Sequence, residues 1–134
     1  MASEEKGSAP LRSEADIVRS RQVVRTLTQQ LKFSLVDQTK LITAASELSR
    51  NTLIYGGGGD MEWEILNAGV RVGLKLKFRD QGPGIPDMEL ALKDGWTSGK
   101  GMGLGLSGSK RLVHDFEIES VVGEGTCVSV TRWK

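Results

Sequence analysis

A carboxylate and a carboxamide lie four residues apart in a helix-like stretch, at Glu47 and Asn51. On a helix this spacing puts both side chains on one face, with Cβ atoms about 6 Å apart. An amide oxygen suits Mg²⁺, which takes oxygen ligands and keeps several waters, and a carboxylate can accept a proton from an attacking hydroxyl. A solvated helix face would also carry such a pair. The pair alone therefore does not distinguish a binding site from a solvated helix face, and the rest of the sequence must decide.

The stretch from Arg79 to Leu106 is the second chemical feature, because eight of the 17 glycines lie between residues 82 and 108. Glycines at this density let backbone N–H groups approach an anion such as phosphate, which predicts a nucleotide site. Asp80 stands at the expected end of a strand, where it can accept a hydrogen bond from an exocyclic amine such as that of adenine. Gly82 and Gly84 would keep the wall of the site thin, although an ordinary turn would use the same residues.

Three better-known phosphate loops do not fit the second glycine cluster, Gly-Met-Gly-Leu-Gly-Leu at 101–106. A Walker A loop needs lysine where Ser109 stands. A Rossmann loop follows a strand, and this cluster follows Trp-Thr-Ser-Gly-Lys. The His-Arg-Asp and Asp-Phe-Gly motifs of eukaryotic protein kinases are absent from the sequence. We therefore expect a lid that leads into a helix start, with Gly123-Glu-Gly-Thr as a hairpin turn and Thr126 offering a hydroxyl to the ligand.

The composition narrows the possible functions. A chain of 134 residues with 38% hydrophobic and 26% charged residues is typical of one soluble domain. A net charge of +1 without a Lys/Arg block gives little support to nucleic-acid binding. The sequence contains neither an apolar run of about 20 residues nor a signal-peptide pattern, which indicates no membrane association. The single cysteine, Cys127, is typical of the reducing cytoplasm.

The apolar periodicity predicts two long helices and two hairpins. Ser13 is expected to cap a helix that reaches Leu31, and Ser34 one that reaches about Tyr55, where four glycines follow. The predicted buried stripes contain Ile17, Val18, Arg21, Val24, Leu27 and Leu31 on the first helix, and Leu35, Val36, Thr39, Ile42, Ala45 and Leu48 on the second.

The remaining elements complete the predicted fold. The hairpins pair 61–66 with 70–78 and 116–122 with 126–133, a third helix covers 104–114, and 86–93 form one or two helical turns. We predict an α+β fold, a two-layer α/β sandwich with a mixed, mostly antiparallel sheet and helices on one face. Residues 1–10 are expected to form a flexible tail, and 11–134 the functional domain.

Four features in this order resemble the N, G1, G2 and G3 boxes of the GHKL (Bergerat-fold) ATPases and kinases. They are Glu47 with Asn51, Asp80-x-Gly-x-Gly, Gly-x-Gly-x-Gly and Gly-x-Gly-Thr, and the resemblance covers about residues 14–133. Within this superfamily the chain is most similar to the RsbT-type serine/threonine switch kinases of bacterial partner-switching (stressosome) pathways. The stretches that carry this similarity are 14–18, 36–38, 46–51, 80–86 and 109–112.

Related classes fit less well. Sensor histidine kinases often carry a basic residue three positions after the N-box asparagine, where this chain has Ile54. They also need a phosphoacceptor helix, which a lone His114 behind the G2 box does not supply. Hsp90, gyrase and mismatch-repair ATPases have longer lids and further domains.

The resemblance implies ATP and Mg²⁺ as cofactors and assigns roles to the residues of the four boxes. Asp80 would hold the adenine amino group, Asn51 would ligate Mg²⁺, and Glu47 would act as general base toward a serine or threonine hydroxyl. Lys100 would reach the γ-phosphate, and Thr126 would lie near the base and Asp80. The pocket and lid would be shaped by Gly82, Gly84, Ile85, Gly101, Gly103, Leu104 and Gly105.

The resemblance further implies protein partners. The substrates would be STAS-domain antagonist or scaffold proteins of a stressosome, and the released kinase would activate a PP2C-type phosphatase. One alternative is an anti-sigma factor kinase that sequesters a sigma subunit. Another is a degenerate module that signals by binding nucleotide alone.

Overall fold

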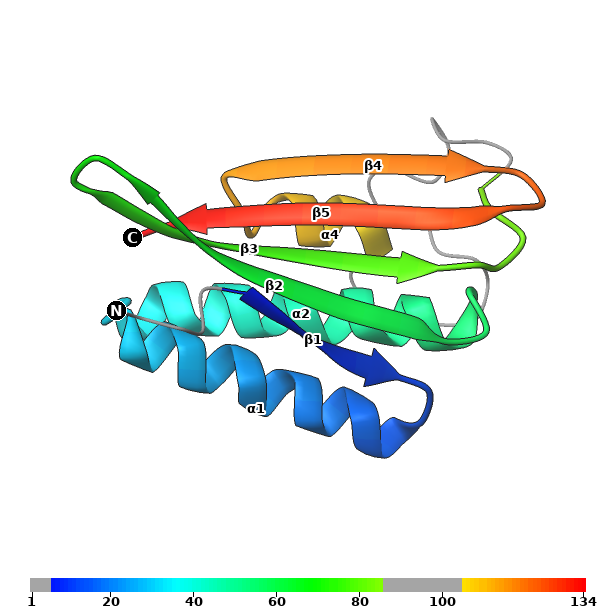
Figure 1. Cartoon of the computed structure of the whole chain (residues 1–134), viewed down its shortest axis with the longest axis horizontal. Coiled ribbons are helices and arrows are strands. Elements are labelled where there is room, and N and C mark those ends of the chain that lie inside the picture. The colour runs from blue at the N-terminus through cyan, green and yellow to red at the C-terminus, as the bar shows by residue number, and fades with distance from the viewer. Residues whose placement is uncertain (1–5, 86–104) are drawn as a thin grey trace.

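The computed structural model describes residues 6–85 and 105–134, and these form a sheet covered on one face by helices (Figure 1). The sheet has five strands in the order β1-β2-β3-β5-β4, and every pair is antiparallel. The strands are β1 Lys6–Leu11, β2 Gly59–Ala68, β3 Arg71–Asp80, β4 Asp115–Val121 and β5 Gly125–Trp133. The helices are α1 Glu14–Gln30, α2 Leu35–Ile54 and α4 Gly105–Lys110. The predicted α+β fold with helices on one face is confirmed.

Both long helices begin at the predicted caps. The Ser13 hydroxyl accepts a hydrogen bond from the Asp16 amide at 3.2 Å, and the Ser34 hydroxyl accepts one from the Asp37 amide at 3.1 Å. Each bond satisfies one of the backbone donors that a helix start leaves free. In α2 the last helical residue is Ile54, directly before Tyr55 and the glycine run, as predicted.

The buried stripe of α2 differs from the predicted one. Leu35 and Val36 are 77% and 62% exposed, and Val18 on α1 is 50% exposed. The buried stripe of α2 consists of Leu41, Ala44, Ala45, Leu48, Ser49 and Thr52. One helical turn before Leu41, this stripe passes through Asp37 rather than through Leu35 or Val36. The two apolar residues of the first turn were therefore assigned to the wrong face.

Two further predictions are wrong at the element ends. Lys6–Pro10 are not a flexible tail, since they belong to β1, which pairs with β2 and buries Ala9 and Leu11. The stretch lacks strand-favouring residues, and Pro10 is tolerated because β1 is an edge strand. The third helix ends at Lys110 rather than at His114, because the His114 amide donates to the Thr131 carbonyl and leads the chain into β4. The helical turns predicted for 86–93 lie outside the described residues.

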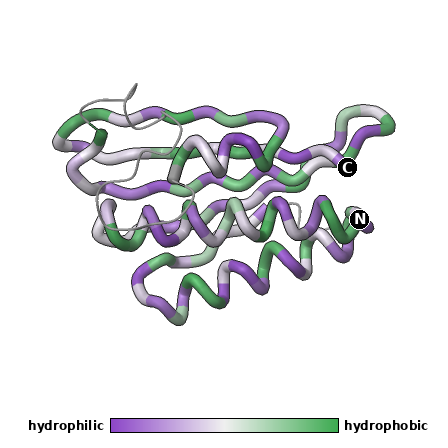
Figure 2. Tube along the Cα trace, turned by 180° about the vertical axis from the view of Figure 1, so that it is seen from behind, coloured by the Kyte–Doolittle hydropathy of each residue, from purple (hydrophilic) through white to green (hydrophobic). Residues whose placement is uncertain are grey.

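The core lies between the sheet and the helices. Leu74, Leu76 and Phe78 of β3 are at most 1% exposed, and Val128 and Val130 of β5 are also buried beside α2. Hydrophobic and hydrophilic residues alternate along the strands (Figure 2), as expected for a sheet with one buried face. None of the described helices is long and apolar enough to cross a membrane.

An ion pair joins the start of α2 to β5. Arg132 donates to Asp37 Oδ1 from Nη2 at 2.6 Å and from Nε at 3.2 Å, and Nη1 donates to the Leu112 carbonyl at 3.0 Å. The Arg132 side chain is only 12% exposed. Its hydrogen bond holds the pKa of Asp37 below the usual value of 3.8. The pair therefore connects α2, β5 and the segment after α4.

We expect Asp37→Ala to lower the free energy of unfolding at pH 7 by about 1.5–3 kcal/mol, because it leaves the Arg132 guanidinium without its charged acceptor. The folded pKa of Asp37 lies below the unfolded one, so this contribution is present above pH 3.8 and is lost as the pH falls through the folded pKa. Urea unfolding of both proteins at pH 7 and near pH 3 measures this. Glu124→Ala, in an exposed turn, is the control. A difference that persists unchanged in acid would contradict the assignment.

Candidate functional site

Asp80 ends β3 and joins two segments that are distant in the sequence. Its Oδ1 accepts hydrogen bonds from the Gly82 amide at 2.9 Å and from the Thr126 amide at 3.2 Å. The first fixes the exit from β3, and the second fixes the start of β5. The other carboxylate oxygen, Oδ2, lies against Gly56. Oδ1 thus joins the exit from β3 to the start of β5, and Oδ2 can accept a hydrogen bond from a ligand.

Three glycines surround Asp80 because no side chain fits there. A Cβ on Gly56 would lie 2.4 Å from Asp80 Cβ and Cγ, and one on Gly125 would lie 2.2 Å from the Asp80 carbonyl oxygen. Gly125 also has a φ of 134°, which side chains rarely adopt. A Cβ on Gly82 would lie 2.7 Å from Gly56 Cα. The run at 56–59 was predicted only to end a helix, yet Gly56 forms part of this wall.

We expect Gly56→Ala to displace the Asp80 carboxylate and to lower the free energy of unfolding by about 1–3 kcal/mol, the usual cost of overpacking. The thermal unfolding temperature and the nucleotide affinity, measured on the same preparation, should both decrease. Gly57→Asn is the matched control, because a Cβ there meets nothing within 4 Å and asparagine tolerates its φ of 73°. Equal behaviour of the two variants would show that Gly56 does not support Asp80.

Ser120 on β4 forms a second junction at the site. Its hydroxyl accepts a hydrogen bond from the Ile85 amide at 2.7 Å and lies 2.8 Å from Thr126 Oγ1. Beside it, the Gly123 amide donates to the Pro83 carbonyl at 2.8 Å. The loop after Asp80 is thereby fastened to the β4–β5 turn. Sequence reasoning missed Ser120, although Phe116, Ile118 and Ser120 alternate along one face of β4, which places a hydroxyl at an inward position.

Glu47 and Asn51 lie one turn apart on α2, and each buries an oxygen atom. Glu47 Oε2 and Asn51 Oδ1 have no hydrogen-bond partner among the described residues. Buried polar atoms in folded proteins usually have a hydrogen-bond partner, so these two oxygens are available to an ion, a water or a ligand. Burial raises the pKa of Glu47 above its usual value, while the charge of Arg50 partly opposes this. A carboxylate in this environment is a stronger base than an exposed one.

The helix that carries Glu47 and Asn51 leads directly to the Asp80 wall. The Asn51 carbonyl accepts hydrogen bonds from the Tyr55 amide at 2.9 Å and the Gly56 amide at 3.3 Å, and Gly56 then packs on Asp80. The end of α2, the end of β3 and the β4–β5 turn lie at the same end of the molecule (Figure 1). The structure therefore brings Glu47 and Asn51 to the end of the fold that holds Asp80 and Thr126.

The predicted lid is only partly described. Gly105 is the first residue of α4, which packs against α2. Gly82, Gly84 and Ile85 lie in the loop fastened by Asp80 and Ser120. Lys100, Gly101, Gly103 and Leu104 lie outside the described residues. In residues 6–85 and 105–134, no group of three or more His, Cys, Asp or Glu side chains could hold a metal ion. A metal at Asn51 would therefore need oxygens from a ligand and from water.

Known proteins are similar in sequence to this chain over most of its length. The family described as histidine kinase-, DNA gyrase B-, and HSP90-like ATPase matches residues 36–134. Serine/threonine-protein kinase RsbT of Bacillus subtilis (strain 168) is 43% identical over 121 residues, which are 90% of this chain and 91% of that protein.

Two further relatives carry another name. The anti-sigma F factor of Geobacillus kaustophilus (strain HTA426) is 29% identical over 84% of this chain and 81% of its own length. The anti-sigma F factor of Thermoanaerobacter sp. (strain X514) is 26% identical over 85% of this chain and 82% of its own length.

Proposed function

The chain belongs to the family of histidine kinase-, DNA gyrase B-, and HSP90-like ATPases and is a serine/threonine-protein kinase that uses ATP, and we propose that it is a Mg-ATP-dependent partner-switch kinase. In this proposal it phosphorylates STAS-domain antagonist and scaffold proteins in the cytoplasm. After release from them it activates a PP2C-type phosphatase. The observation that carries the proposed chemistry is the buried Glu47 Oε2, which has no hydrogen-bond partner among the described residues and lies one helical turn from the equally buried Asn51 Oδ1.

Asp80 recognises the adenine in this proposal. Its Oδ1 is occupied by the Gly82 and Thr126 amides, so Oδ2 is left to accept a hydrogen bond from the exocyclic amine. Gly56, Gly82 and Gly125 keep the surroundings of the carboxylate free of side chains, so that a flat base can approach. The Ser120–Thr126 contact holds the start of β5 in place beside Asp80.

Asn51 holds Mg²⁺ in this proposal, and its environment fits the ion. Its Oδ1 is a hard oxygen ligand, buried and without a hydrogen-bond partner in residues 6–85 and 105–134, and Mg²⁺ favours such oxygens together with phosphate and water. When bound, the ion neutralises charge on the phosphate oxygens during phosphoryl transfer. Lys100 is assigned to the γ-phosphate because of its charge and its position before the second glycine cluster.

Glu47 is the general base in this proposal. Its carboxylate accepts the proton of the serine or threonine hydroxyl as that oxygen forms its bond to the γ-phosphorus, and the bond from the γ-phosphorus to the bridging oxygen of ADP breaks. Burial strengthens the base by raising its pKa. Phosphoryl transfer depends mainly on positioning and charge neutralisation, so a small set of residues is sufficient.

Removal of the Asn51 amide tests the metal assignment. We expect Asn51→Ala to weaken Mg-ATP binding about 10-fold, the value of one hydrogen bond or ion contact to a charged group. Affinity for ATP in excess EDTA should stay unchanged, because only the metal contact is lost. Thermal stability should stay equal or rise, since the buried oxygen has no partner among the described residues. An unchanged affinity for Mg-ATP would exclude Asn51 as the ligand.

The partner class is tested by capture. The anti-sigma F factor relatives favour a second candidate, a kinase that sequesters a sigma subunit directly. The tagged full chain is incubated with ADP or ATP and with purified STAS proteins, PP2C-type phosphatases and sigma factors from the same genome. We expect a STAS protein to be retained and released upon phosphorylation, and a phosphatase to be retained and activated. Capture of a sigma factor alone would overturn the proposal and favour the second candidate.

A further inference from the structure

Arg50 stands on α2 beside the two residues that the proposed chemistry uses. It follows Glu47 by three positions and precedes Asn51 by one. At 3.6 residues per turn, Asn51 lies about 40° from Glu47 around the helix, and Arg50 lies about 60° from Glu47 on the other side. Residues three apart on a helix have Cβ atoms about 5–6 Å apart, so Arg50 and Glu47 are surface neighbours. The proposed metal ligand, the proposed base and a cation therefore follow one another around α2.

The Arg50 guanidinium is only loosely held. Within the described residues its ion pair is with Glu14, at the start of α1, and the distance from Nη1 to Oε1 is 3.6 Å. A charge-assisted hydrogen bond is about 2.7–2.9 Å long, and Arg19 and Arg132 approach their carboxylates to 2.6 Å. The Glu14 side chain is 71% exposed, so water screens the pair. Arg50 can therefore leave Glu14 at a small cost and turn to another anion.

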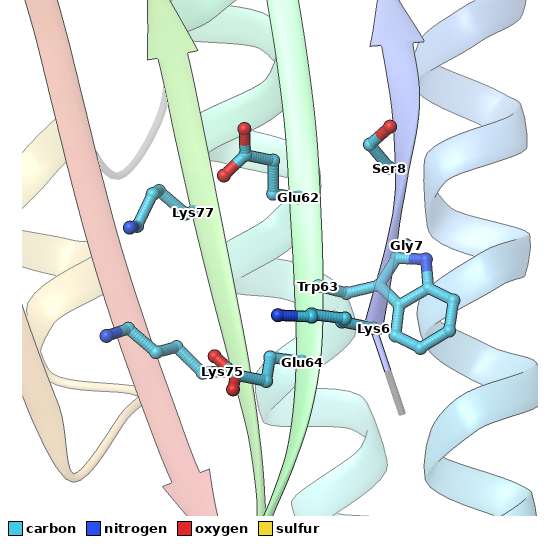
Figure 3. A pocket seen from close by; sticks show the side chains of 8 residues that line it. All are labelled: Lys6, Gly7, Ser8, Glu62, Trp63, Glu64, Lys75 and Lys77. Carbon is cyan, nitrogen blue, oxygen red and sulfur yellow. The ribbon is translucent and has the colours of Figure 1, made fainter. Parts of the chain in front are cut away.

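The charge of Arg50 also acts on the proposed base. It opposes the rise in the pKa of Glu47, so the guanidinium lies within electrostatic range of that carboxylate. The lysines of the hollow over β1–β3, by contrast, lie on the face of the sheet away from the helices (Figure 3). In the strand register those lysines stand across from Glu62 and Glu64. Arg50 is thus a cation that α2 itself places beside the base, on the helix side of the sheet.

We propose that Arg50 is a further catalytic residue, which leaves Glu14 and holds the transferred phosphoryl group on the side of the acceptor oxygen. In this step the substrate hydroxyl oxygen forms its bond to the γ-phosphorus, its proton passes to Glu47, and the bond from the γ-phosphorus to the bridging oxygen of ADP breaks. Arg50 forms no covalent bond, and its planar guanidinium donates two hydrogen bonds to phosphoryl oxygens. The inference rests on the proposed function, because it adds a residue to the proposed transfer site.

The place of Arg50 on the helix determines what it contributes. Seen from Asn51 it lies beyond Glu47, so it meets the phosphoryl group as that group approaches the acceptor, and not in bound Mg-ATP. A contact that forms only in the transition state raises the transfer rate and leaves the affinity for the nucleotide unchanged. Glu14 holds the guanidinium in the resting chain.

Aluminium fluoride tests this contact without a protein substrate, because AlF₄⁻ bound beside Mg-ADP mimics the phosphoryl group during transfer. By calorimetry, the wild-type full chain should bind Mg-ADP at least about 10²-fold more tightly with aluminium fluoride than without it. Arg50→Gln should reduce this gain at least about 10-fold, while Mg-ADP alone binds as before. Arg50→Lys keeps the charge without the planar fork and should recover part of the gain. Arg25→Gln, which removes an exposed arginine from α1, is the matched control.

Glu14→Gln separates catalysis from a structural link between the helices. Glu14→Gln and Arg50→Gln break the same ion pair, so a purely structural pair predicts the same effect from both. A catalytic Arg50 predicts that Glu14→Gln keeps the full gain from aluminium fluoride, or increases it up to about 5-fold, because the guanidinium no longer has to leave a partner. Equal effects of the two variants on the gain would overturn the inference.

Transfer to a purified STAS-domain protein from the same genome is the second measurement. Arg50→Gln should lower the single-turnover rate at least about 10²-fold at unchanged affinity for Mg-ATP. If Arg50→Gln keeps the wild-type gain from aluminium fluoride, or the wild-type transfer rate, this inference fails and the proposed function stands. A wild-type chain that binds no Mg-nucleotide would refute both.

Discussion

Replacement of Glu47 by glutamine should abolish most phosphate transfer and leave ATP binding intact. Glutamine keeps the shape of the side chain but cannot accept the proton of the attacking hydroxyl. General-base catalysis contributes about 10²–10⁴-fold, so we expect the single-turnover rate to fall by this factor. The affinity for Mg-ATP, measured by calorimetry, should change little. A variant that transfers phosphate at the wild-type rate would exclude Glu47 as the base.

The raised pKa of Glu47 leads to two further predictions, one for the pH dependence of the transfer rate and one for stability. Transfer needs the ionised carboxylate, so the rate should decrease with falling pH at a higher pH than an ordinary glutamate of pKa 4.5 would give. Arg50→Gln removes the charge that opposes the shift, so it should move this acid limb further up. When the pKa of a carboxyl group is higher in the folded than in the unfolded protein, the free energy of unfolding decreases as the pH rises between the two pKa values. Glu47→Gln should therefore be as stable as the wild type at pH 7, or more stable.

Replacement of Asp80 by asparagine should change the preferred base. The remaining Oδ1 can still accept the Gly82 and Thr126 amides, but the new NH₂ group faces the ligand as a donor. Adenine presents a donor there, whereas hypoxanthine presents a carbonyl acceptor. We expect ATP affinity to fall about 10–100-fold, as for loss of a hydrogen bond to a charged group, and ITP affinity to rise relative to it.

Calorimetric titration of ATP and ITP into the same preparations measures this exchange. Asp60→Asn is a matched control on β2, because Asp60 pairs with Arg79 in the strand register and, by strand alternation, faces the side of the sheet opposite to Asp80. Asp80→Ala should lose both nucleotides and some stability, because two backbone amides lose their acceptor. If Asp80→Asn kept the wild-type preference for ATP, the adenine would be recognised elsewhere.

The sequence predicted those parts of the fold that depend on local signals. Ser13 and Ser34 cap the two long helices because a short hydroxyl side chain satisfies a free backbone amide. The hairpins follow from alternation and from their turns. The strand at Lys6–Leu11 was not predicted, because it forms through pairing with β2, a long-range contact without a local sequence signal. The wrong stripe on α2 has a similar cause, since the Asp37–Arg132 pair decides which side of its first turn faces β5.

The residues of the candidate site also divide into those that the sequence could identify and those that only the structure identifies. Glu47, Asn51 and Asp80 could be named because their residue types and spacing match a family pattern. Gly56 and Ser120 could not, because their importance comes from contacts across the fold, with Asp80 and with Ile85 and Thr126. A glycine run after a helix is first of all a helix stop. Only the structure reveals that one of these glycines leaves space for a carboxylate on the neighbouring strand.

The most direct test of the proposed function is a transfer experiment with γ-labelled ATP. The full chain, Mg²⁺ and a purified STAS-domain protein from the same genome are incubated, and the label is located by mass spectrometry. We expect phosphoserine or phosphothreonine on the STAS protein, made by the wild type and lost in Glu47→Gln, while both proteins bind Mg-ATP equally. Labelling by Glu47→Gln at the wild-type rate, or ATP binding by the wild type without phosphate on any STAS protein, would contradict the proposed function.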